Sequence, residues 1–314
     1  MIVDHQVHWL PPAALDGLAR RQRVPRAERT GDGWLLENVE GGKLPVPQEM
    51  HDLDYQLELA TNLGIDVLVV SSPPLAEVMH LPGDEAAELL QQLNGTLAAA
   101  QRENPDRVVA LASLPLQDPD EALRVLDAAV ADGIRGVMVM SSIEGRPIAT
   151  DETLPVYRRI DELGLPIVLH PAVRSQTLEG TRPSVGEGGI GWMAHTSLAA
   201  FNLIESGTLD ACPRLPVLHP HLGGVLPYLL GRIQRIQNER QELDIGRYLR
   251  ERFYTDTVGR TPGQIGFALK TYGEGRVLFG SDHPFEQMAW MKRFVIDEGA
   301  AEAVFPHVLP GLLP

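Results

Sequence analysis

The feature that most constrains the fold is a regular alternation of short apolar runs with longer segments of helical spacing. Eight runs rich in branched aliphatic residues recur along the 314 residues, separated by segments whose apolar residues repeat at helical intervals. The predicted strands span residues 2–7, 65–71, 108–114, 136–140, 166–170, 215–219, 253–258 and 277–280. Because these runs are nearly all apolar, we expect both faces of each strand to be buried under other elements.

The intervening segments predict the helices that would cover such strands. They span residues 52–63, 84–102, 118–131, 154–163, 226–238, 261–272 and 285–296, and the first three begin at an acidic residue suited to an N-cap. Eight strand–helix repeats predict an α/β fold, a (β/α)8 TIM barrel. An open doubly wound sheet is the alternative, but the first strand runs into His-Trp-Leu-Pro-Pro rather than a glycine-rich phosphate loop.

Two segments interrupt the alternation, and nothing between them resembles a linker, so we predict one domain over residues 1–314. Residues 12–50 carry the turn-like sequences GDGW and GG and are predicted to form a small hairpin insertion after the first strand. Residues 172–212 contain GEGGIGW and are predicted to form a loop–helix insertion after the fifth strand, with an extra helix at 197–207. Both follow strand ends, where barrel enzymes carry their active sites.

Composition narrows the classes of partner. The formal net charge is −15, which argues against nucleic acid and against an anionic membrane surface, because both need a basic protein face. No apolar stretch approaches the roughly 20 residues of a membrane span. With one cysteine, Cys212, an intramolecular disulfide is impossible. We therefore expect a cytoplasmic protein that acts on a small molecule.

Polar side chains that follow the predicted strands point to a metal. Besides Gln6, they are mostly imidazoles, with one carboxylate, and we expect them to meet at one mouth of the barrel: His8, His170, His219, His221 and Asp282. Imidazole and carboxylate groups converging on one point form a divalent metal site with an open position. Any one of these residues alone is more often structural.

The same residues lie in segments that resemble the amidohydrolase superfamily, in the branch of aminocarboxymuconate-semialdehyde decarboxylase. The resembling segments are VDHQVHWLPP, LPIVLHPA, SGTLDACPRLPVLHPHLGGVLPYLLGR and RVLFGSDHPF, in the order of the family. The resemblance implies His8, His170 and Asp282 as metal ligands. It implies that His221 is an acid, base or polarising group, with Asp282 as the other catalytic residue. It also implies a homodimer.

The chain departs from the family at Gln6, where the first ligand should be histidine. His5 cannot replace it, because side chains alternate along a strand. Positions 6 and 8 therefore lie on one face and position 5 on the other. Gln6 can offer an amide oxygen, a weaker ligand for zinc than imidazole. Either a weakened site holds one divalent metal, with zinc favoured over manganese, or the metal has been lost. His219 could compensate for the missing imidazole or could be a core residue.

The region expected to bind the substrate also departs from the family pattern. The family arginine that pairs with a substrate carboxylate is missing; Pro47 lies near its place, and Lys43 is the nearest cation. We predict that His219, His195 and Trp192 contact the substrate. The resemblance favours a metal-dependent decarboxylase of a small unsaturated or aromatic carboxylic acid. Metal-dependent hydrolysis of an ester, lactone or amide is the first alternative. A metal-free barrel that serves as a binding protein or acid/base enzyme is the second.

Overall fold

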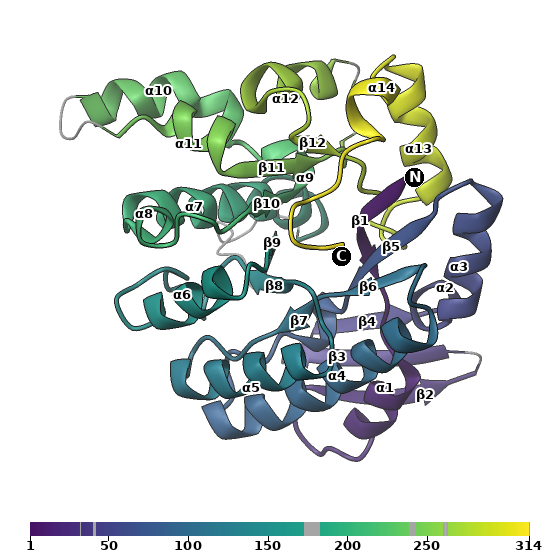
Figure 1. Cartoon of the computed structure of the whole chain (residues 1–314). Coiled ribbons are helices and arrows are strands. Elements are labelled where there is room, and N and C mark those ends of the chain that lie inside the picture. Colours follow the sequence, from purple (N-terminus) through teal and green to yellow (C-terminus); the bar gives the residue numbers. More distant parts are fainter. Residues whose placement is uncertain are drawn as a thin grey trace.

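Eight parallel strands form a closed barrel in the computed structural model, which describes residues 1–31, 33–39, 42–172, 183–238, 243–259, 261 and 263–313. In chain order, the barrel strands are β1 (Val3–His8), β5 (Val67–Ser71), β6 (Val108–Ala110) continued by β7 (Ala112–Ser113), β8 (Val137–Met140), β9 (Ile167–His170), β10 (Val217–His219), β11 (Phe253–Asp256) and β12 (Val277–Leu278). Every barrel strand pairs with its chain neighbour in parallel, which confirms the predicted barrel (Figure 1).

The barrel closes where the chain after β12 meets β1. The backbone N–H of His5 donates to the carbonyl of Phe279 at 2.9 Å, and the N–H of His8 donates to the carbonyl of His283 at 2.7 Å. These bonds place the end of the last strand beside the end of the first. Residues at positions 6, 8 and 282, far apart in sequence, therefore share one rim.

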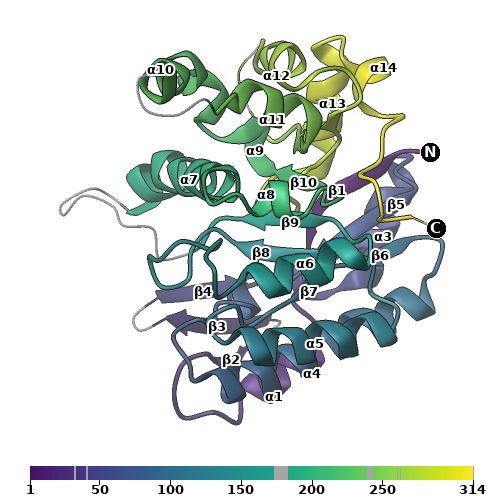
Figure 2. The ribbon, with the colours of Figure 1, turned by 60° about the vertical axis from the view of Figure 1, so that its left-hand side comes forward.

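Helices cover the outside of the barrel, as Figures 1 and 2 show. They are α3 (Leu53–Asn62), α4 (Gly83–Glu103), α5 (Pro119–Ala131), α6 (Leu154–Glu162), α7 (Trp192–Glu205), α8 (Thr208–Ala211), α10 (Leu226–Asn238), α11 (Ile245–Glu251), α12 (Gln264–Tyr272), α13 (Met288–Asp297) and α14 (Ala301–Val304). Two expected caps are present, because Asp52 accepts from the N–H of Tyr55 and Asp118 from that of Glu121. The third expected cap is wrong, since α4 begins at Gly83 and Asp84 lies inside its first turn.

The insertion after β1 is larger than the hairpin expected from its turns. It contains α1 (Pro12–Leu18), an antiparallel sheet of β2 (Arg26–Thr30), β3 (Gly33–Val39) and β4 (Gly42–Val46), and α2 (Gln48–His51). Trp34 and Leu36 on β3 are buried, so one face of this sheet packs onto the domain. Figure 2 shows the insertion sheet reaching the side of the barrel opposite the two chain termini.

The connection from β9 to β10 consists of η2 (Pro183–Gly191), α7 and α8 within the described residues. The helix predicted at 197–207 is present, but it begins at Trp192 and buries Ala199 and Leu203. It therefore also serves as the covering helix of this strand pair. No helix in the described part of the chain has both the length and the apolar character needed to cross a membrane.

Candidate metal and active site

The inward face of β1 carries the first residues of the site. All of β1 is buried, and alternation turns Asp4, Gln6 and His8 toward the barrel interior. His5 lies on the opposite face, where its Nδ1 donates to the carbonyl of Phe279 at 2.9 Å and its Nε2 accepts from the N–H of Leu309 at 3.2 Å. His5 thus fastens the C-terminal segment to the barrel, as the strand parity predicts for a residue that is not a ligand.

Replacing His5 with alanine should weaken the fold and spare the metal site. We expect the free energy of unfolding to fall by about 2–4 kcal/mol, because a buried ring and two buried hydrogen bonds are lost. Burial lowers the pKa of His5 to about 4 from 6.5, so the neutral ring stabilises the fold above pH 6.5. That contribution is lost as pH falls toward 4, so the difference between wild type and variant in urea unfolding should shrink in that range. Unequal metal contents of the two proteins at pH 7.5 would contradict this role.

His8 and Asp282 form the centre of the site. His8 is 1% exposed, and its Nε2 lies 2.9 Å from Oδ1 of Asp282. Its Nδ1 lies 3.0 Å from the hydroxyl oxygen of Ser71 at the end of β5. This hydrogen bond to Ser71 orients the ring so that Nε2 faces the centre of the barrel mouth. Metal-binding imidazoles are commonly oriented by such a bond to the other ring nitrogen.

His170 approaches the same point from β9. Its Nδ1 donates to the carbonyl of Pro171 at 2.8 Å, so Nε2 is the nitrogen left for a ligand. The rings of His8 and His170 are perpendicular, with centroids 5.1 Å apart. Burial, together with the neighbouring His8, lowers the pKa of His170 to about 3, so its ring is neutral at pH 7. Neutral imidazole is the form that binds metal.

These three side chains fit a divalent cation. One ligand atom from each of His8, His170 and Asp282 lies within 4.8 Å of the other two. Two bonds of about 2.0–2.2 Å to zinc span about 3.4 Å at a tetrahedral angle, so the more distant ligand atoms would move together by about 1 Å to complete the coordination. Two imidazoles and one carboxylate leave a position for a substrate oxygen.

Gln6 adjoins this triad through its amide nitrogen. Nε2 of Gln6 donates to Oδ1 of Asp282 at 3.1 Å and lies 3.5 Å from Nε2 of His221. The amide oxygen is buried and has no partner in the described residues. In this orientation Gln6 holds the carboxylate of Asp282, and turning the amide over would present its oxygen to the same centre instead.

His221 and Asp282 form a coupled pair. Nε2 of His221 lies 3.5 Å from Oδ2 of Asp282. Burial alone would lower the pKa of His221, but the hydrogen bond and negative charge of Asp282 outweigh it, so this pKa is raised. Burial would raise the pKa of Asp282, but His221 and His8 hold it well below its usual range. The pair therefore consists of a carboxylate and an imidazole that favours its protonated form.

A cavity of about 260 Å³ opens above these groups. Its walls are mostly apolar and come from β3, β4, the loop after β5, the end of β9, α7, the turn after β10 and the loop after β12. They are formed by Asn38, Gly42, Lys43, Leu44, Pro73, Pro74, His170, Pro171, Trp192, His221, Asp282 and Phe285. Trp192 is one of these lining residues, and its indole nitrogen is buried without a partner in the described residues. Such a slot suits a small flat molecule with one polar end.

The side chain of Lys43 does not point into this cavity. Lys43 pairs with Glu37, while the next residue, Leu44, pairs with the buried Leu36. Paired residues share a face, so the Lys43 side chain lies with Glu37 on the outer face, where both border another hollow. Among the described walls, Lys43 and His221 are the residues that can carry a positive charge near neutral pH; the Lys43 side chain lies on the outer face, and His221 is already paired with Asp282.

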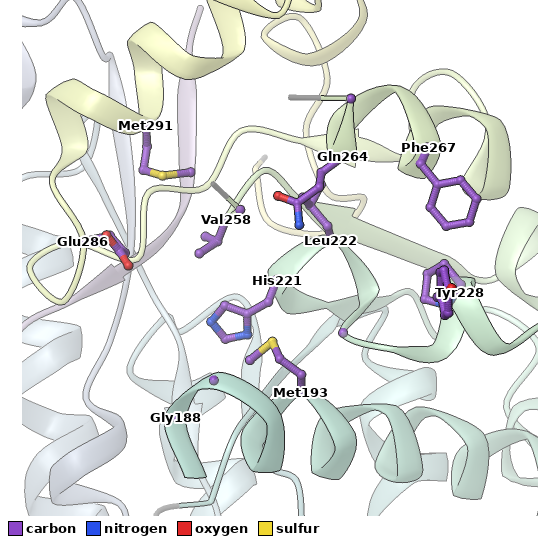
Figure 3. Close-up of a pocket in the computed structure, with 15 residues that line it drawn as sticks. Gly188, Met193, His221, Leu222, Tyr228, Val258, Gln264, Phe267, Glu286 and Met291 are labelled. Atoms are coloured by element: carbon purple, nitrogen blue, oxygen red, sulfur yellow. The ribbon is translucent and has the colours of Figure 1, made fainter. Parts of the chain in front are cut away.

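A second, larger hollow of about 590 Å³ lies on the other side of His221. Figure 3 shows the His221 ring beside Met193, with Glu286 and Met291 to one side and Phe267 and Tyr228 to the other. His221 lines both cavities, so its ring lies between them.

Two predicted substrate residues do not reach the cavity. His219 is completely buried, and neither ring nitrogen has a partner in the described residues. Burial lowers the pKa of His219 to about 3. His195 lies on α7 and is not among the residues that border the 260 Å³ cavity. The geometry thus assigns neither residue a contact with a molecule bound there.

Sequence reasoning missed Ser71 and Asp256. Ser71 supports His8 from β5, and Asp256, at the end of β11, accepts from the backbone N–H of His221 at 2.8 Å. A signal was present for each, since Ser71 is a polar residue at a strand end and Asp256 an acidic residue in a buried strand.

Comparison with known proteins agrees with this geometry. The sequence matches the family described as amidohydrolase over residues 3–308. The chain belongs to the amidohydrolase family. A gamma-resorcylate decarboxylase of Rhizobium radiobacter is 34% identical, over 75% of this chain and 77% of the relative. A 2-amino-3-carboxymuconate-6-semialdehyde decarboxylase of Dictyostelium discoideum is 26% identical, over 74% of this chain and 67% of that relative.

A solved relative supports the same branch of the amidohydrolases. It is 2,6-dihydroxybenzoate decarboxylase complexed with 2,6-dihydroxybenzoate, with a TM-score of 0.72 and 27% identity. The match covers 79% of this chain and 83% of that one. The branch suggested by the sequence segments is therefore confirmed for this amidohydrolase.

Proposed function

We propose that the protein is a metal-dependent decarboxylase of a small aromatic carboxylic acid. One observation carries the proposal: the clustered triad of His8, His170 and Asp282 adjoins a mostly apolar cavity, which is lined by His170, Asp282 and the acid/base partner His221. The named relatives, which are decarboxylases, support the same chemistry.

His8, His170 and Asp282 would hold the metal, and we propose zinc, with manganese as the alternative. When bound, a divalent ion supplies a Lewis acid that fixes a substrate carboxylate. The apolar walls exclude water and hold the ring, with Trp192 and Phe285 on its flanks.

The proton required by decarboxylation is assigned to His221. The bond between the ring carbon and the carboxyl carbon breaks, carbon dioxide leaves, and the electron pair stays on the ring carbon. Nε2 of His221 then gives its proton to that carbon, and the ring is protonated again from solvent. Asp282 raises the pKa of His221, and this favours His221 as the acid.

The described cavity walls contain no arginine, their one lysine, Lys43, lies on the outer face of its sheet, and His221 is paired with Asp282, which restricts the substrate. A dicarboxylic acid would bury a second charge without a partner, which costs several kcal/mol. We therefore propose an aromatic monocarboxylic acid, with any ring substituents neutral.

A panel of substrates tests this proposal. Zinc- and manganese-loaded protein would be incubated with benzoates carrying hydroxyl, methyl or second carboxyl groups, and with matched methyl esters and lactones. We expect release of carbon dioxide from one or more monocarboxylates and little from their dicarboxylate counterparts. Turnover of the esters or lactones alone would favour the hydrolase instead.

Gln6 allows a prediction about metal affinity. Gln6→His should raise zinc affinity by roughly 10–100-fold, the scale on which single changes around a metal act. The reason is that imidazole is a stronger zinc ligand than an amide. Competition with a chromogenic chelator measures the affinity, and an equal affinity in both proteins would show that position 6 does not face the metal.

The resemblance also motivates a proposal about assembly and location. We propose a homodimer in the cytoplasm. Light scattering of the purified protein would give the mass directly, and the mass of one 34.4 kDa chain would contradict the dimer.

A further inference from the structure

The backbone that carries His221 is unusual. Residues 221–224 all have positive φ, and the first two, His221 at 57° and Leu222 at 55°, are not glycine. Each non-glycine residue in this region is strained, and such strain persists only where the surroundings hold it. Gly224 shows how tightly this turn fits, because a Cβ there would lie 2.5 Å from the carbonyl oxygen of Met193.

Asp256 is the group that holds the beginning of this turn. Its Oδ1 accepts from the N–H of His221 at 2.8 Å and from the N–H of Val258 at 3.1 Å. One carboxylate oxygen thus ties the strained turn after β10 to the end of β11. Oδ2 is buried and has no partner among the described residues.

Packing fixes Asp256 in turn. Asp256 is completely buried, and a Cβ at Gly280 would lie 2.8 Å from the Cβ of Asp256. The carbonyl of Gly280 accepts from the hydroxyl of Thr257 at 3.0 Å, which ties the chain after β12 to the end of β11. The carboxylate therefore has little room to move, and the position it dictates for His221 is defined.

We propose that Asp256 is a positioning residue that sets the His221 ring within reach of Asp282 and of the bound substrate. It acts through its acceptor oxygen on the backbone of His221, and its charge is not required. The inference rests on the proposed function only in assigning proton transfer to His221.

Two substitutions distinguish the role of the acceptor oxygen of Asp256 from the role of its negative charge. Asp256→Asn keeps an oxygen with two lone pairs, so kcat should stay within about threefold of wild type and the pH profile should not move. Asp256→Ala removes the acceptor, and kcat should fall by about 10²-fold, the scale expected for an angstrom of misplacement, with KM nearly unchanged. Equal losses in both variants, or a shifted pH profile for Asp256→Asn, would overturn the proposal.

Asp161 is a matched control. Its buried carboxylate accepts from the backbone N–H of Arg214 at 2.7 Å, before β10 rather than after it. Asp161→Ala removes a similar bond and should change kcat per folded molecule little. A loss as large as that of Asp256→Ala would mean that any buried carboxylate matters equally, which contradicts a specific positioning role.

Crystal structures of the two Asp256 variants give a readout independent of turnover. We expect His221 in Asp256→Asn to keep its positive φ and its distance from Asp282, and in Asp256→Ala to lose both. An unmoved His221 in Asp256→Ala would refute the positioning role even if no substrate is found. A moved ring together with failure of every carboxylic acid would refute only the proposed function.

Discussion

Asp282→Asn should give the largest loss of activity of any single substitution. We expect turnover to fall at least about 10³-fold, because the residue is both a proposed ligand and the partner that raises the pKa of His221. Metal content should also fall by at least about tenfold, since the amide is neutral and cannot replace a carboxylate that touches His8 at 2.9 Å. Steady-state assay and elemental analysis of the same preparation would measure both effects.

A surface carboxylate controls for the loss of one negative charge. Asp297 is mostly exposed and lies 3.4 Å from Arg293 on α13. Asp297→Asn should leave turnover and metal content unchanged. If Asp282→Asn keeps its full metal content, Asp282 is not a ligand. If the variant keeps its full turnover, Asp282 has no part in catalysis.

His221→Gln is expected to give the second largest loss, of a different kind. Turnover should fall by about 10²–10⁴-fold, the range for loss of a general acid, while the metal content should stay near that of wild type. His221 is not one of the three clustered ligands, and its raised pKa favours proton donation rather than coordination. Comparison of kcat and metal content in one preparation separates these effects.

The matched control for His221 is His307, which packs against Gly275 near the C-terminus. His307→Gln should leave both quantities unchanged. If His221→Gln loses its metal together with its activity, His221 belongs to the coordination sphere, and the proton must come from another group.

The barrel and the metal triad could be predicted because their signals are local. Apolar runs and caps such as Asp52 mark the elements, and strand ends carry His8 and His170. The first strand of the insertion, β2, was not predicted, because it reads Arg-Ala-Glu-Arg-Thr with mostly exposed side chains. Such a strand is held by backbone pairing with β3 rather than by an apolar pattern.

The details around the triad depend on contacts between distant segments. The position of Lys43 follows from its pairing with Glu37, which no local pattern fixes. The role of Asp256 follows from the turn at His221, whose positive φ is indicated in sequence only by the two following glycines. A strained turn is held by contacts with distant parts of the fold. The sequence can therefore indicate where such a turn lies, but not which residue, here Asp256, holds it.

The most direct test of metal-dependent decarboxylation is the release of carbon dioxide from a carboxyl-labelled hydroxybenzoate by chelated and reconstituted protein. We expect no release from the chelated protein, and recovery that saturates at about one zinc or manganese ion per chain, as expected for a single site. Release that is equal with and without metal would contradict the account, because the triad of His8, His170 and Asp282 would then serve another purpose.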